Sequence, residues 1–267
     1  MKILLINLDK STDRLEQQKN QFNELGLEFE RLPAVSIHDF SDDEYKKMAF
    51  NGQRPMKQSE LACFLSHKKA WDYIVEHNEP CVVLEDDAVL VKDFKNILED
   101  LEKITDIDYV NLEVHGRKKT VAKQSTYSIA NNSYDLLEIY VDRSGTGGYV
   151  LYPAGAKILL TFMNKRAIGL SDEFIHSCYA LKAFQIEPAA LLQSDKCPEY
   201  AVSCDCIHGS VIGQVKNKSS FALAKSELFA FKMRRIKTQI CLGLRQLQCL
   251  GKGVKREIQV NPSKFNG

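Results

Sequence analysis

Hydrophobic and polar residues follow two periodicities along this chain. Short apolar runs between turn-forming residues predict strands, and apolar residues at steps of three and four predict helices. The predicted strands span residues 2–8, 27–35, 81–84, 107–113, 136–141, 147–152 and 184–192, the last one interrupted by Pro188. The predicted helices span residues 12–25, 93–104, 154–164 and 221–250, with a short helix opened by a capping box at residues 41–44 and a longer one that begins near Ser59.

The order of these elements indicates the fold class. Strands and helices alternate through the first 113 residues, which predicts an α/β fold with a mainly parallel sheet and helices on both faces. Residues 115–134 are polar and predict a mobile loop. The glycine-rich run at residues 144–148 predicts a turn, or a loop whose backbone approaches a ligand closely.

Composition narrows the class of protein. With 44% hydrophobic and 27% charged residues, the 267-residue chain has the balance of a soluble globular protein. A net charge of +1 argues against a general nucleic-acid binder, so we expect no nucleic-acid partner. The charge is unevenly placed, because residues 225–267 hold ten basic and two acidic side chains whereas residues 1–224 hold 26 basic and 33 acidic ones.

The basic tail contains the clearest amphipathic helix of the sequence. Its apolar residues recur at helical spacing: Phe229, Met233, Ile236, Ile240, Leu244 and Leu247. One interpretation is that this apolar stripe packs on the domain and the charges face water. The other is that the basic face attaches to an anionic membrane surface, and the two can coexist.

Targeting signals and cysteines indicate the compartment. No stretch approaches the ~20 apolar residues that span a bilayer, and residues 1–9 predict a buried strand rather than a secretory signal. We therefore expect the eight cysteines to be reduced thiols of a cytosolic protein. Cys197, Cys204, Cys206 and His208 could instead hold zinc, although their spacing matches no common zinc finger.

Three consecutive acids directly follow the buried strand at residues 81–84, namely Glu85, Asp86 and Asp87. Ligands of open α/β sheets bind at the carboxyl ends of strands, and oxygen ligands suit Mg²⁺ or Mn²⁺. In extended chain Glu85 and Asp87 converge while Asp86 diverges. The pattern therefore predicts either a divalent metal site at Glu85 and Asp87 or a solvated acidic turn.

A metal ion that binds the diphosphate of a nucleotide stabilises that diphosphate as a leaving group. If the group it leaves is transferred with inversion, a base must also take the proton of the acceptor hydroxyl. Asp172 and Glu173 lie at the predicted start of a helix, where Ser171 could be the cap. Acids at that position also complement the helix dipole, so a structural role is the alternative.

The motifs together resemble glycosyltransferase family 25, the bacterial lipooligosaccharide galactosyltransferases and their relatives. They occur in the family's order between residue 3 and about residue 193. The matching segments are Ile6-Asn7-Leu8-Asp9, Asp13-Arg14-Leu15, Glu60-Leu61-Ala62-Cys63-Phe64-Leu65-Ser66-His67, Leu84-Glu85-Asp86-Asp87, Asn111-Leu112-Glu113, Gly145-Thr146-Gly147-Gly148-Tyr149-Val150, Leu170-Ser171-Asp172, and Gln185-Ile186-Glu187-Pro188 with Gln193.

The resemblance implies a GT-A-like fold, to which we assign residues 1–220. The basic amphipathic pattern described above makes residues 221–267 a separate C-terminal helical segment. It also implies a UDP-sugar donor, usually UDP-galactose and sometimes UDP-glucose, a divalent metal such as Mn²⁺ or Mg²⁺, and inversion at the anomeric carbon. The acceptor would be a sugar of a growing lipooligosaccharide, at the cytoplasmic face of the inner membrane.

The same resemblance assigns roles to individual residues. The acids Glu85, Asp86 and Asp87 occupy the family's DxD-like position, with Glu85 and Asp87 on the metal. The donor-binding set is Asn7, Arg14, Ser66, His67 and Asp86.

The resemblance makes Asp172 the expected base, because it matches the family's candidate base. Leu170-Ser171 replaces the usual Pro-Val and Glu173 follows Asp172, so Glu173 is an alternative. Glu113, inside another matched motif, is a third candidate and could alternatively bind sugar hydroxyls. A non-catalytic nucleotide-sugar-binding assembly factor on the membrane is the competing function.

Overall fold

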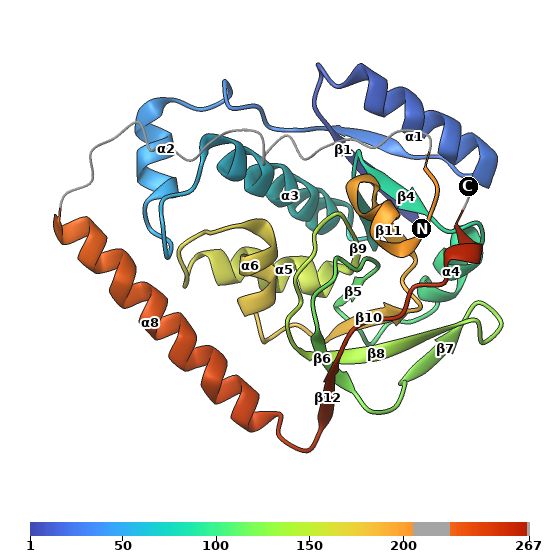
Figure 1. The fold of residues 1–267 in the computed structure, drawn as a ribbon. Coiled ribbons are helices and arrows are strands. Elements are labelled where there is room, and N and C mark those ends of the chain that lie inside the picture. The colour runs from blue at the N-terminus through green and yellow to red at the C-terminus, as the bar shows by residue number, and fades with distance from the viewer. Residues whose placement is uncertain (205–224, 266–267) are drawn as a thin grey trace.

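The computed structural model describes residues 1–204 and 225–265. Its centre is a sheet with the strand order β2-β1-β3-β9-β5-β10-β8-β6-β12, and β7 also pairs with β8 (Figure 1). Strands β2, β1, β3, β5 and β10 run in one direction, whereas β9 and β8 run against them. The predicted α/β class with a mixed, mainly parallel sheet is confirmed. The strands are β1 (Lys2–Asn7), β2 (Glu30–Pro33), β3 (Cys81–Glu85), β5 (Tyr109–Asn111), β6 (Lys119–Ala122), β7 (Tyr127–Ile129), β8 (Tyr134–Val141), β9 (Gly148–Leu151), β10 (Ala183–Glu187) and β12 (Gly253–Arg256).

Both faces of the sheet are covered by helices, because both faces of its central strands are apolar. Along β1, Ile3 and Leu5 enter one core while Leu4 and Ile6 enter the other. The first core includes side chains of α1 and α4, and the second includes side chains of α2, α3, α5 and α6. The helices are α1 (Thr12–Leu25), α2 (Asp42–Ala49), α3 (Gln58–His77), α4 (Phe94–Leu101), α5 (Pro153–Met163), α6 (Ser171–Ser177) and α8 (Lys225–Gln248).

Local signals set several helix ends as predicted. Ser41 and Glu44 form the predicted capping box of α2. Gly26 ends α1 with a φ of 61°, a left-handed conformation that glycine adopts without strain.

Two predicted segments differ from the structure. The polar stretch 115–134 is not one loop, because it contains β6 and β7, which pair with β8. Side chains along β6 alternate between buried and half-buried, so the strand carries only a weak apolar signal. The predicted strand 184–192 is two strands, β10 and β11 (Leu191–Gln193), and β11 pairs with β4 (Ala88–Leu90) beside the main sheet.

The tail forms a helix within the predicted range, but the interpretation in which its apolar stripe packs on the domain is wrong. The apolar stripe of α8 faces solvent, and a different face, with the buried Phe231, lies against the domain. After the helix, β12 pairs with β6, and Ile258 and Phe265 enter the first core. Through residues 1–204 and 225–265, no helix combines the length and apolar character that crossing a membrane requires.

Candidate active site

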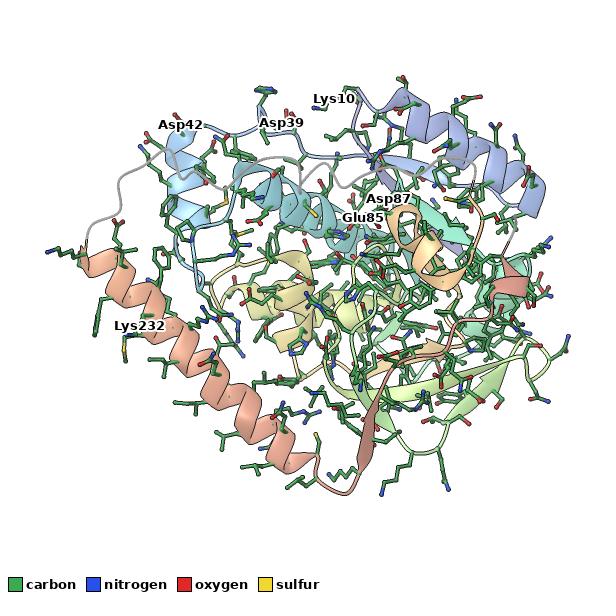
Figure 2. All side chains as sticks on the ribbon, in the orientation of Figure 1. Lys10, Asp39, Asp42, Glu85, Asp87 and Lys232 are labelled. Atoms are coloured by element: carbon green, nitrogen blue, oxygen red, sulfur yellow. The ribbon has the colours of Figure 1, made fainter. Side chains whose placement is uncertain are left out.

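A pocket of about 530 Å³ opens at the carboxyl ends of β1, β2 and β3. Its walls come from the segment after β1, the segment after β2, one face of α3, and the three acids at the end of β3, Glu85, Asp86 and Asp87. In Figure 2, Lys10 and Asp39 lie at the rim beyond Glu85 and Asp87, and Lys232 on α8 lies well away from them. The parallel strands thus bring together, at one edge of the sheet, residues as far apart in the sequence as Asn7 and Asp86, which are 79 positions apart.

The three acids point to different partners. Glu85 lies beside His67, with 3.3 Å between its Oε1 and the imidazole Nε2. Asp86 accepts a hydrogen bond of 2.8 Å from Asn7 Nδ2 and one of 2.8 Å from Arg14 Nη1. Asp87 is buried, and its Oδ2 lies 3.9 Å from Arg14 Nη1.

Asp87 is the least satisfied member of this group. Its Oδ1 is buried and has no hydrogen-bond partner among the described residues. Burial, together with the negative charges of Glu85 and Asp86, raises the pKa of Asp87 to about 8. A positive charge beside this oxygen would relieve both the desolvation and the repulsion.

A chain of hydrogen bonds orients His67 toward Glu85. Trp71 Nε1 donates to the Tyr149 hydroxyl at 2.9 Å, and that hydroxyl lies 3.0 Å from His67 Nδ1. The hydroxyl proton therefore goes to Nδ1, which leaves Nε2–H to donate to Glu85. Burial opposes ionisation of Glu85, but hydrogen bonds from His67 and Thr146 outweigh it and lower the pKa of Glu85. The carboxylate is therefore held ionised and fixed in direction.

Ser66 has its hydroxyl committed to the fold. It accepts from the backbone N–H of Val35 at 2.8 Å and donates to the carbonyl of Ala62 at 2.8 Å. Ser66 therefore holds the segment after β2, which forms one wall of the pocket, against α3.

Arg14 lines the same pocket, and Asn7 adjoins it through its hydrogen bond to Asp86. Asn7 ends β1 and also donates to the carbonyl of Ser11 at 3.0 Å. Its Oδ1 accepts from Arg31 Nε at 2.9 Å. Asp86, between Asn7 and Arg14, thus ties the segment after β1 to the end of β3.

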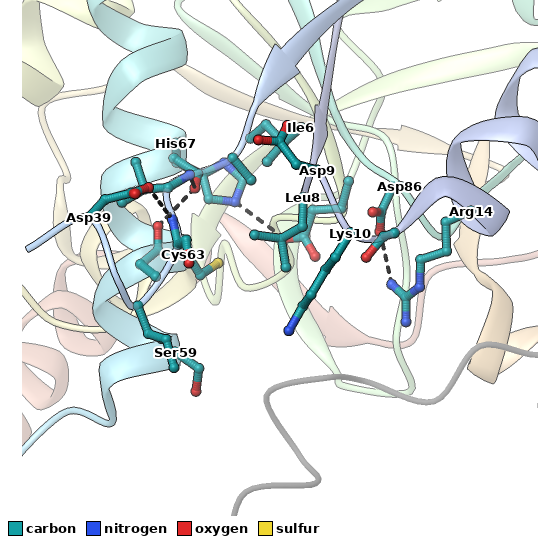
Figure 3. A pocket seen from close by; sticks show the side chains of 18 of the residues that line it. Ile6, Leu8, Asp9, Lys10, Arg14, Asp39, Ser59, Cys63, His67 and Asp86 are labelled. Carbon is teal, nitrogen blue, oxygen red and sulfur yellow. Dashed lines mark hydrogen bonds and ion pairs between the residues drawn. The ribbon is translucent and has the colours of Figure 1, made fainter.

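Lys10 and Cys63 line the pocket and had no assigned role in the sequence. Figure 3 shows the ion pair of Arg14 with Asp86 on one side, His67 and Cys63 on the other, and Lys10 between them. Lys10 directly follows the matched motif that ends at Asp9. Its position just after the first predicted strand is the sequence feature that could have identified it as a pocket residue. Cys63 precedes His67 by one helical turn, and this i, i+4 spacing places both on one face of α3.

Cys63, His67 and Glu85 each offer a ligand atom within 4.8 Å of the others. Both ring nitrogens of His67 already have partners, however, in Tyr149 and Glu85. Burial and the nearby carboxylates also raise the pKa of the Cys63 thiol, which disfavours the thiolate that binds metals. The carboxylates of Glu85 and Asp87 are therefore the better ligands, and they suit a hard cation.

The three base candidates lie outside the pocket lining, and they differ in setting. Glu113 is buried under the 144–148 loop, where its Oε1 accepts from the backbone N–H of Gly147 at 2.8 Å. Burial and the charge of Glu85 raise the pKa of Glu113 to about 8. A Cβ on Gly145 or Gly147 would collide with this carboxyl group, so these glycines allow the loop to pack on Glu113.

Asp172 and Glu173 begin α6 beside the far wall. Glu173 accepts a hydrogen bond from the Gln53 side chain, and Asp172 Oδ1 accepts from the backbone N–H of Glu173 at 2.7 Å. Next to them, Ser171 Oγ lies 3.7 Å from Cys63 Sγ, which lines the pocket. The structure therefore brings Asp172 near the pocket wall while Glu173 is held toward Gln53.

Of the alternative zinc ligands, Cys197 and Cys204 are not among the residues that line this pocket. The Sγ atoms of Cys197 and Cys204 lie near the carbonyl oxygens of Gln193 and Ser194. Cys206 and His208 fall outside the described residues, so zinc at these four positions stays a prediction.

Comparison with known proteins places this geometry in context. Residues 1–175 match the model of glycosyltransferase family 25, described as an LPS biosynthesis protein family. A glycosyltransferase 25 family member of Aedes aegypti is 32% identical over 194 residues, which cover 65% of this chain and 30% of that protein. The procollagen galactosyltransferase 1-B of Xenopus laevis is 29% identical over 222 residues, covering 71% of this chain and 35% of that protein.

A putative glycosyltransferase of Haemophilus influenzae matches over a larger share of both chains. It is 25% identical over 248 residues, which cover 84% of this chain and 85% of that protein. The chain spans only about 30% of the length of the insect relatives. Among solved structures, the galactosyltransferase LgtC is 12% identical with a TM-score of 0.38, and the match covers 69% of this chain and 73% of LgtC.

Proposed function

The chain belongs to glycosyltransferase family 25, and on that premise we propose that it is an inverting, metal-dependent transferase that uses a UDP-sugar. The sugar is a hexose, with galactose favoured over glucose, and the acceptor is a sugar hydroxyl of a growing lipooligosaccharide or lipopolysaccharide. The observation that carries this proposal is one pocket whose lining includes the acids Glu85 and Asp87 together with the cations Lys10 and Arg14.

The carboxylate oxygens that the pocket offers as ligands fit a divalent cation. Glu85 is held ionised by His67 and Thr146, and Asp87 presents a buried oxygen without a partner among the described groups. Oxygen ligands of this kind suit Mn²⁺ or Mg²⁺. When bound, such an ion compensates the negative charge that develops on a departing nucleotide diphosphate.

The basic residues of the pocket support binding of a diphosphate. Lys10 and Arg14 both line it, and they come from the segment that Asn7 and Asp86 hold in place. Arginine and lysine bind phosphate oxygens through charge-assisted hydrogen bonds. The segment after β1 would therefore bind the donor diphosphate on the side opposite to His67.

Asp172 is the candidate that best fits the role of base. Glu113 is covered by the 144–148 loop, and Glu173 is bound by Gln53. Asp172 adjoins Ser171, which contacts the pocket residue Cys63. In that position its carboxylate would accept the proton of an acceptor hydroxyl as the hydroxyl attacks the sugar.

The acceptor also implies a location. A lipooligosaccharide is built on a lipid, so we propose that the protein works at the cytoplasmic face of a bacterial inner membrane.

The test is a transfer assay with UDP-galactose or UDP-glucose, Mn²⁺ and a lactose-type or glucosyl acceptor. Wild type should give a β-linked product, and either excess EDTA or Asp87→Asn should reduce turnover at least about a hundredfold. The matched control Asp43→Asn removes an exposed acid of α2 and should retain full activity.

Two results would count against the proposal. One is unchanged turnover in EDTA or by the Asp87→Asn variant. The other is calorimetric binding of UDP without transfer to any acceptor, which would favour a non-catalytic binding protein.

A further inference from the structure

Helix α8 lies at the edge of the molecule (Figure 1), and an exposed stripe of apolar side chains runs along it and just past its end. Its side chains are between 39% and 72% exposed. Between Phe229 and Leu247 the stripe is about 27 Å long, at 1.5 Å per residue. A stripe of this length is unusual on a surface that only meets water. Its members are Phe229, Met233, Ile236, Ile240, Leu244, Leu247 and Leu250.

The opposite face of α8 is fixed to the domain by specific contacts. Phe231 is buried, and Arg234 Nη1 donates to the carbonyl oxygens of Phe50 and Gly52 at 3.0 and 3.2 Å. Arg245 Nε donates to the carbonyl of Tyr140 at 3.1 Å, and its guanidinium lies 4.9 Å from the ring centre of Tyr179. These contacts set the rotation of the helix, so the stripe is left facing outward.

Basic side chains border the stripe. At 100° per residue, Lys232 falls beside Ile236 on one edge, followed by Arg235, and Lys237 falls beside Leu244 on the other. All three basic side chains are exposed. The acid of α8 is Glu227, which falls on the domain side of the helix by the same geometry. An outward apolar face with cationic edges is the pattern of a helix that lies in a membrane interface.

We propose that α8 binds in the plane of an anionic lipid bilayer, with the stripe among the acyl chains and Lys232, Arg235 and Lys237 at the headgroups. This inference rests on the proposed function in one respect, because the proposed lipid-linked acceptor is the reason why membrane binding would be useful. It differs from the interpretation in which the apolar stripe packs on the domain, because that stripe is directed away from the domain together with the basic residues at its edges.

Charge favours a lipid surface over a second copy of the chain as the partner that covers the apolar stripe. Two copies that paired their stripes would bring the same basic edges together, and like charges at an interface repel. Anionic headgroups neutralise those edges instead, and each basic residue near the lipid strengthens binding.

The test is flotation of the full-length protein with vesicles, without donor or acceptor. The protein should bind phosphatidylcholine vesicles that contain phosphatidylglycerol, bind pure phosphatidylcholine more weakly, and lose affinity as salt rises. The double variant Ile240→Ser/Leu244→Ser should lower the partition coefficient about tenfold or more. Its melting temperature should not change, because both side chains are exposed.

Two further variants sharpen the result. Val254→Ser changes an exposed apolar residue of β12 outside the stripe and should bind vesicles as wild type does. Lys232→Glu/Arg235→Glu should remove the preference for phosphatidylglycerol.

The proposal fails if the wild type does not float, or if Ile240→Ser/Leu244→Ser floats equally well. It also fails if sedimentation shows a dimer that this variant dissociates. Loss of sugar transfer with retained flotation would count only against the proposed function.

Discussion

Asp87→Asn offers a test of the candidate metal site that does not depend on catalysis. In the metal-free protein, burial and two neighbouring acids raise the pKa of Asp87 from 3.8 to about 8. Between pH 5 and pH 8 the folded state therefore keeps a proton that the unfolded chain has released. Raising the pH across this range lowers the stability of the wild type, because the unfolded state becomes progressively favoured. Asparagine has nearly the same shape and removes this dependence.

The magnitude follows from the linkage between proton binding and folding. Each pH unit contributes at most 1.36 kcal/mol, so three units set a ceiling of about 4 kcal/mol. Relaxation around a buried charge reduces such ceilings, and we expect a relative gain of ~2 kcal/mol for Asp87→Asn at pH 8 compared with pH 5. In a chain of this size that corresponds to a shift of roughly 4–8 °C in melting temperature.

The assay is thermal unfolding of both proteins in EDTA at pH 5 and pH 8, repeated with Mn²⁺. Mn²⁺ should raise the melting temperature of the wild type, more so at pH 8, and should have little effect on the Asp87→Asn variant. The reasoning is refuted if the variant gains nothing over the wild type between pH 5 and pH 8 in EDTA. A Mn²⁺ response that is equal in both proteins would show that the ion binds elsewhere.

Three further predictions concern the surroundings of the pocket. His67→Ala removes the partner that orients Glu85 and should weaken Mn²⁺ binding about 10–100-fold, as measured by calorimetry. Gly145→Ala should destabilise the protein by about 2–3 kcal/mol in urea unfolding, because Gly145 has a φ of 105° and an added Cβ would collide with a buried carboxyl group. Asp172→Asn should lower kcat about 10²–10⁴-fold while Glu173→Gln retains most of it, and the reverse result would reassign the base.

The sequence predicts well those features that depend on neighbouring residues. The apolar run before Glu85 predicts β3, and the order of strands and helices predicts the sheet that brings the ends of β1 and β3 together. The capping box at Ser41 and the left-handed Gly26 are equally local. Such features form wherever the chain carries the right pattern, so the location of the pocket follows from them.

The partners of each acid do not follow from local pattern, because they depend on contacts between distant segments. In extended chain Glu85 and Asp87 would share one face, but β3 ends at Glu85 and the next two acids lie in a turn. Asp86 is therefore free to meet Asn7, which is 79 residues away, while Asp87 turns into the protein.

The orientation of α8 also depends on contacts between distant segments. Its periodicity predicts a helix with an apolar side, but the contacts of Arg234 and Arg245 with the domain determine that this side faces outward. Periodicity thus identifies which faces a helix has, and only the packing of the whole chain determines which of them remains available to a partner.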